Sequence, residues 1–189
     1  TMFKKTTFLL GTLSTTLLCA SAQADWALNS EQSSLYFATV KNATVSEVHH
    51  FKKIDGAISE EGKAVLAITL DSVDTANPVR DERMQLQLFE TKKFPSAIVN
   101  LDLGSEGVKS GVQTITAMLN LHGISKEVST QVFVEQNDKS ITVSSLAPLM
   151  IGAPDFGMAK GIEELRDLAK LESISMTVPA TFRLVYDKK

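Results

Sequence analysis

The clearest structural signal in the sequence is the stretch Met176-Thr177-Val178-Pro179-Ala180-Thr181-Phe182-Arg183-Leu184-Val185-Tyr186. Every second residue from Met176 to Tyr186 is apolar, and most of the residues between them are polar. Successive side chains of a β-strand point to opposite faces of a sheet, so this pattern predicts a strand with one buried face. Pro179 cannot donate to a strand ladder, which predicts a position at an edge, at a bulge or near the strand entry.

The same period of two recurs along the rest of the chain, and turn signals separate the runs. Further predicted strands cover residues 33–41, 42–50, 51–58, 66–70, 97–103, 115–121, 128–134 and 141–150. The turn signals are Glu60-Glu61-Gly62, Gly104-Ser105-Glu106-Gly107, His122-Gly123 and Asn137-Asp138. Because these connections are short, neighbouring strands should pair antiparallel, with a tight hairpin at Gly123.

Two segments break the strand period and predict short helices. Residues 77–84 open with Asn77 as a cap and Pro78 at the first helical position. Residues 161–171 place Ile162, Leu165 and Leu168 on one face. About eight strands with one or two short helices predict an all-β antiparallel barrel, with a sandwich as the other arrangement. A barrel of this size has room for packed side chains or for one small ligand.

The first two dozen residues have the composition of a secretory signal. Lys4 and Lys5 precede a short apolar run, and Ala22-Gln23-Ala24 forms a small-x-small cleavage site. A transmembrane anchor is the less favoured alternative, because a span needs about 20 mostly apolar residues. We therefore expect cleavage after Ala24, a single mature domain over residues 25–189, and a location in the bacterial periplasm or cell envelope.

Charge and composition exclude several classes of function. Without Lys4 and Lys5, the 19 basic residues become 17 against 22 acidic residues, a formal net charge of −5, which argues against nucleic acid as a partner. Cys19 is the only cysteine and leaves with the signal, so we expect no disulfide, thiolate nucleophile or cysteine metal site. No hydrolase elbow, zinc-protease motif, phosphate-binding loop or dinucleotide fingerprint is present, and we expect neither a cofactor nor a metal.

Several motifs, in the same order and spacing, resemble those of the YceI-like polyisoprenoid-binding proteins. They are Leu70-Asp71-Ser72-Val73-Asp74-Thr75, Arg80-Asp81, Leu88-Phe89, Phe94-Pro95, Leu119-Asn120-Leu121-His122-Gly123-Ile124-Ser125-Lys126, and Asp155-Phe156-Gly157. The resemblance implies a lipocalin-like barrel whose elongated apolar cavity holds an isoprenoid or another long-chain lipid, in a family with many exported members, some of them dimeric. The chain departs from the family pattern at His50, Ile54 and Arg83, and its helix after Gly161 is longer than usual.

The candidate cavity residues are large apolar side chains of the predicted strands and helices. They are Phe37, Val45, Val48, Phe51, Phe89, Phe94, Met118, Phe133, Met150, Phe156, Leu165 and Leu168. Alternate residues share a face, but the sequence does not say which face points inward, and for each residue plain core packing is the alternative.

Arg80 and Arg83 are candidates for contact with a phosphate or carboxylate head group. The simpler interpretation is local pairing with nearby carboxylates, which are Asp71, Asp74, Asp81 and Glu82.

The leading hypothesis is non-catalytic binding or carriage of an isoprenoid, an isoprenoid quinone included, or of another long-chain lipid. One alternative is an enzyme that acts on such a substrate in the same cavity, with Arg80, Asp81 and His122 as the first suspects. Another alternative is a cell-envelope interaction module whose barrel is filled by side chains. We expect no transmembrane segment in the mature chain, and a homodimer is open.

Overall fold

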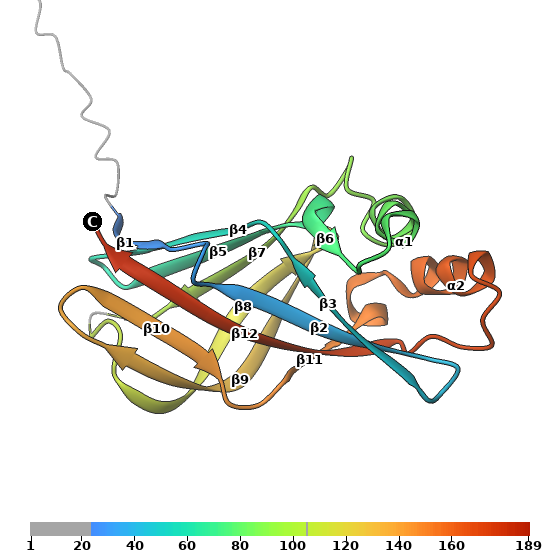
Figure 1. Cartoon of the computed structure of the whole chain (residues 1–189). Helices are drawn as coiled ribbons and strands as arrows, with labels where there is room; N and C mark the ends of the chain where they lie inside the picture. The colour runs from blue at the N-terminus through green and yellow to red at the C-terminus, as the bar shows by residue number, and fades with distance from the viewer. Residues whose placement is uncertain (1–23, 105) are drawn as a thin grey trace, which may run out of the picture.

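The computed structural model describes residues 24–104 and 106–189, so the predicted signal lies outside the described residues except for Ala24. Twelve described strands form one antiparallel sheet (Figure 1). Eight of them close into a barrel because β1 pairs with both β4 and β12. These eight are β1 (Ala24–Leu28), β4 (Ile54–Ser59), β5 (Lys63–Thr69), β7 (Ser96–Asp102), β8 (Gly111–Leu121), β9 (Ile124–Gln136), β10 (Ser140–Ser145) and β12 (Thr177–Lys188). The predicted all-β antiparallel barrel is confirmed.

Strand β12 is the alternating stretch from which the fold was predicted, and it is long enough to pair with two strands along each edge. One edge pairs with β10 and then with β11 (Leu149–Gly152). The other edge pairs with β1 and with β2 (Ser34–Lys41). Strand β2 continues the sheet to β3 (Val45–Phe51) and to the short β6 (Val73–Asp74), so these strands extend the barrel wall at one end.

The hairpin between β8 and β9 has a two-residue loop, as the sequence predicts. Leu121 and Ile124 are paired, and the loop residues His122 and Gly123 have φ angles of 53° and 76°. Two successive positive φ angles define the primed turn that matches the twist of antiparallel strands.

The two predicted helices lie side by side at one end of the barrel (Figure 1). Helix α1 (Pro78–Arg83) is capped by the Asn77 side chain and runs on into a π-helical segment, η2 (Met84–Leu88). Helix α2 (Ala159–Leu168) ends three residues earlier than predicted. Lys170 adopts a left-handed conformation with a φ of 54°, which is typical just beyond a helix end. Two short 3-10 segments, η1 (Leu70–Ser72) and η3 (Ala153–Phe156), complete the described elements.

Several predicted strand boundaries differ from the structure, and the three clearest cases follow. The strand predicted from residue 42 begins at Val45, because Asn42 and Ala43 form a turn with φ angles of 49° and 61°. The strand predicted from residue 51 begins only at Ile54. The predicted strand 141–150 is two strands, β10 and β11, separated by a bend. Among the described residues, no helix has both the length and the apolar character that a membrane crossing requires.

Candidate functional site

The barrel encloses a cavity of about 560 Å³. Its wall is built from the inward faces of the alternating strands. Strand β8 contributes Ile115, Ala117, Leu119 and Leu121, and the chain at β12 contributes Met176, Val178, Ala180, Phe182, Leu184 and Tyr186. The residues that form the alternating sequence pattern are therefore cavity residues as well as core residues. The interior is not filled by side chains, so the filled-barrel alternative is wrong.

Six of the predicted site residues lie on the cavity wall. Four of them are apolar, namely Phe37 on β2, Phe51 on β3, Phe89 after η2, and Leu165 on α2. The other two are Arg80 and Arg83 on α1. Their contact with a ligand stays a prediction.

Six other predicted cavity residues lie outside the cavity, with exposed side chains. They are Val45, Val48, Met118, Phe133, Met150 and Leu168. Met118 lies between the inward-facing Ala117 and Leu119, so strand alternation turns it to the outer face. Phe133 on β9 is next to the cavity-lining Val134, and Met150 on β11 lies between the cavity-lining Leu149 and Ile151. Both side chains therefore point outward as well. For Met118, Phe133 and Met150, the predicted place on the cavity wall is wrong because strand parity turns each side chain outward.

Phe94 and Phe156 also lie outside the cavity wall, but they pack elsewhere. The Phe94 ring lies 4.4 Å from that of His122, measured between centroids, under the β8–β9 hairpin. Phe156 is buried in η3 as part of the hydrophobic core. For Phe156, the structure shows the core packing that the sequence left open as the alternative, whereas Phe94 is half-buried and lies outside the core cluster.

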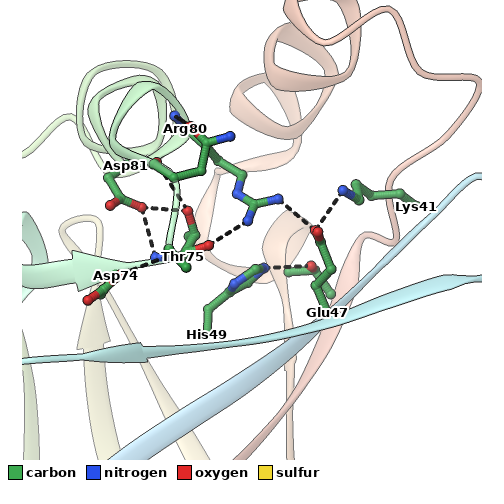
Figure 2. A network of polar contacts seen from close by, with 10 residues as sticks. Lys41, Glu47, His49, Asp74, Thr75, Arg80 and Asp81 are labelled. Atoms are coloured by element: carbon green, nitrogen blue, oxygen red, sulfur yellow. Dashed lines mark hydrogen bonds and ion pairs between the residues drawn. The ribbon is translucent and has the colours of Figure 1, made fainter.

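A polar network occupies the cavity end beneath α1 (Figure 2). The Arg80 guanidinium donates through Nη1 to Glu47 Oε2 and through Nη2 to the Thr75 carbonyl, both at 2.6 Å. Lys41 Nζ lies 2.6 Å from the same Glu47 oxygen. Lys41, Glu47, Arg80 and their neighbour His49 all line the cavity, and we call these four residues the polar end.

Arg80 does not pair with the nearby carboxylates that the sequence suggested. Asp81 instead accepts hydrogen bonds from the Thr75 amide at 2.9 Å and the Thr75 hydroxyl at 2.6 Å. Asp74 pairs with Lys52 at 3.0 Å. The Arg80 side chain reaches across to Glu47 on β3, a partner that sequence proximity could not reveal. Arg83 donates to the Leu168 carbonyl at 3.4 Å, which joins α1 to the end of α2.

His49 is the most deeply buried member of the polar end, with 2% of its surface exposed. Its Nε2 lies 3.0 Å from the Thr39 hydroxyl. Burial lowers the pKa of His49 from its usual value, and the positive charge of Arg80 adds to this effect, so the imidazole is neutral at pH 7. Hydrogen bonding from Lys41 lowers the pKa of Glu47, with the charge of Arg80 contributing, so the carboxylate stays ionised.

Aromatic rings continue the cavity wall from His49 toward α2. Phe37 lies 5.4 Å from His49 and 5.4 Å from Phe51, and Phe51 lies 5.9 Å from Phe89, all measured between ring centroids. These spacings are typical of packed aromatic pairs.

The sequence contains a signal for two residues of the polar end. His49 and His50 are adjacent on a strand, so one of them must face inward, and Glu47 and His49 share the parity of Phe51. The enzymatic alternative finds less support, since of its three suspects Arg80 alone lines the cavity. His122 bonds with Glu90 at 2.6 Å outside the cavity. The described residues contain no group of three or more side chains suited to hold a metal ion.

Comparison with known proteins identifies a family. The model of the YceI-like domain matches residues 26–186. A polyisoprenoid-binding domain from Saccharophagus degradans implicated in plant cell wall breakdown has a similar structure, with a TM-score of 0.83 and 36% identity over 88% of this chain and 100% of that chain.

More distant structures share the fold. Burkholderia cenocepacia BcnA has a TM-score of 0.68 and 21% identity over 84% of this chain and 98% of its own. A Campylobacter jejuni YCEI protein has a TM-score of 0.55 and 18% identity over 75% of this chain and 84% of its own. No curated protein sequence matches the chain significantly.

Proposed function

Since the chain belongs to the YceI-like domain family, we propose that it binds an isoprenoid or another long-chain lipid in its barrel cavity, without catalysis. The proposal rests first on the cavity itself. Its volume of about 560 Å³ lies within the usual range for small-molecule sites, and strand side chains make most of its wall apolar. An interior of this kind excludes water and accepts hydrocarbon.

The energetics favour a chain-like ligand. Burial of one methylene group contributes about 0.8 kcal/mol, so a five-carbon prenyl unit gains roughly 3–4 kcal/mol before entropy is counted. No reactive group is needed for such binding, because the apolar wall supplies the free energy. The Saccharophagus degradans domain, which is described as polyisoprenoid-binding, supports the isoprenoid class among long-chain lipids.

The ligand content of the purified protein tests the proposal. The protein is isolated without detergent, extracted with organic solvent, and the extract is examined by mass spectrometry. The delipidated protein is then titrated with geranylgeraniol and with palmitate. We expect a co-purified long-chain lipid and saturable uptake of at least the prenyl chain. An empty extract together with no uptake of either chain would contradict the proposal.

A matched pair of variants ties uptake to the cavity. Ala117→Phe places a ring inside the barrel, whereas Met118→Phe places one on the outer face of the same strand. We expect the inner variant to lose at least tenfold in affinity for geranylgeraniol and the outer variant to bind as the wild type does. Equal affinities in the two variants would place binding outside the cavity.

We also propose carriage of the lipid in the periplasm. Support comes from the basic start, the apolar run and the Ala22-Gln23-Ala24 site of the sequence. Cell fractionation with intact-mass measurement tests this step, and the expected mass is that of a chain beginning at Asp25. A cytoplasmic protein of uncleaved mass would be the contrary result.

A further inference from the structure

The polar groups of the cavity wall are unevenly distributed. Thr39, Lys41, Glu47, His49, Asn77, Arg80, Arg83 and Ser175 line one end, on or near β2, β3, α1 and the start of β12. The β5, β7 and β8 walls are almost wholly aliphatic and contribute Gln113 as their only polar lining residue. An amphiphile in this cavity therefore has one favourable orientation, with its head at the polar end and its tail along the strands.

Two buried atoms of the polar end have no hydrogen-bond partner among the described residues. They are Nδ1 of His49 and Nε of Arg80. Both side chains line the cavity, and the positive charge of Arg80 acts on His49. A buried polar atom without a partner costs free energy, so a ligand oxygen that supplies the missing hydrogen bonds is favoured here.

The hydrogen-bond donors that are already engaged at the polar end decide which kind of ligand oxygen fits. Both terminal nitrogens of Arg80 already donate to protein acceptors, and Lys41 is paired with Glu47. The charges of Lys41 and Arg80 both meet the single carboxylate of Glu47, because Asp81 accepts hydrogen bonds from Thr75 instead. Arg80 therefore has no free guanidinium fork to offer a phosphate.

We infer that the cavity ligand carries a neutral hydroxyl or carbonyl head group whose oxygen bonds with His49 Nδ1 and accepts from Arg80 Nε. This assignment rests on the proposed lipid-binding function and adds the chemistry and orientation of the head. Neutral His49 can serve as donor or acceptor at Nδ1, because its other nitrogen faces a hydroxyl that can play either role. Both atoms are buried, so the head group reaches them only when the side chains that cover them shift.

Three probes with one carbon skeleton test the assignment: geranylgeraniol, geranylgeranyl phosphate and the corresponding hydrocarbon. Each is titrated into the delipidated full chain of the wild type and of His49→Leu. We expect the variant to lose three- to tenfold in affinity for the alcohol and to keep its affinity for the hydrocarbon. The matched control is His50→Leu on the opposite face of β3, which should bind all three probes as the wild type does.

A second measurement covers the case in which His49→Leu does not fold. The ¹⁵N chemical shift of His49 Nδ1 in the wild type should move when the alcohol is added and stay constant with the hydrocarbon, and the His50 nitrogens should not respond. The assignment is overturned if His49→Leu weakens all three probes equally, or if Nδ1 is insensitive to the alcohol. It is also overturned if the phosphate binds most tightly and Arg83→Gln removes that preference. In each of these outcomes the proposed lipid-binding function still holds. If none of the three probes binds, both the head-group assignment and the lipid-binding function are refuted.

Discussion

Glycine at position 123 is required for two independent reasons. Its φ of 76° lies in the left-handed region, and a Cβ atom there would lie 2.7 Å from Cε1 of Phe94. The Phe94 ring is itself packed on His122, so it has little freedom to withdraw. The β8–β9 turn and the chain segment that carries Phe94 therefore constrain each other.

Gly123→Ala should lower the free energy of unfolding by about 2–3 kcal/mol, because backbone strain and the clash with Phe94 add. Urea denaturation followed by circular dichroism measures the change. Gly107→Ala is the matched control, since Gly107 has a φ of 63° but no atom within 4 Å of a Cβ placed there. It should cost only about 1 kcal/mol. Equal losses in the two variants would show that the Phe94 contact is unimportant.

Tyr186 should make the free energy of unfolding depend on pH in the alkaline range. Burial on the cavity wall raises its pKa to about 12 from 10.0. Above pH 10 the unfolded chain loses this proton and the folded chain keeps it, so the free energy of unfolding falls by up to about 1.4 kcal/mol per pH unit as the pH rises toward 12. Urea unfolding between pH 9 and 11 should show a steeper decline for the wild type than for Tyr186→Phe. Parallel declines would contradict the assignment to Tyr186.

At the scale of the element, strand alternation predicted both the barrel strands and the side chains that line the cavity. The series 115–121 and 176–186 gave two barrel strands and, through their parity, the residues of the cavity wall. The same parity places Met118 outside the cavity, although its size and hydrophobicity made it a predicted cavity residue. Strand ends were less predictable, because the turn at Asn42 and Ala43 depends on left-handed backbone angles that neither residue type requires.

Helix α2 depends on a close approach to η2. A Cβ atom at Gly161 would lie 2.5 Å from the Gln87 carbonyl oxygen and 2.9 Å from the Leu88 Cα, and neither backbone atom can move cheaply. Gly161→Ala should therefore separate α2 from η2, and hydrogen exchange of the α2 amides should quicken at least tenfold while β8 and β9 keep their protection. Lys160→Ala, one position earlier and exposed, is the control and should leave exchange in α2 unchanged. Unchanged exchange in Gly161→Ala would mean that η2 adapts to the extra methyl group.

For the whole molecule, the local sequence patterns predicted a closed barrel, whereas the cavity was implied only by the family resemblance. Closure follows from local patterns and short connections, whereas a cavity depends on the summed volumes of side chains from many strands. The pairing of Arg80 with Glu47 could not be predicted for a related reason. Arg80 and Glu47 are far apart in sequence, and their pairing requires α1 to lie over β3, which no local pattern encodes.

A hollow barrel should gain stability from its ligand, and this gain is the property that a filled barrel would lack. A ligand that binds only the folded state, present at a hundredfold excess over its Kd, adds about 2.7 kcal/mol, which for a domain of this size raises Tm by about 5–10 °C. Thermal unfolding of the delipidated protein with and without geranylgeraniol should show this rise in the wild type and in Met118→Phe. Ala117→Phe should lose most of it, because the added ring occupies the space of the chain. Its own Tm without ligand should stay within a few degrees of the wild type, since the ring fills empty volume instead of displacing packed atoms. A ligand-induced rise of the same size in Ala117→Phe would mean that the stabilising chain binds elsewhere on the protein.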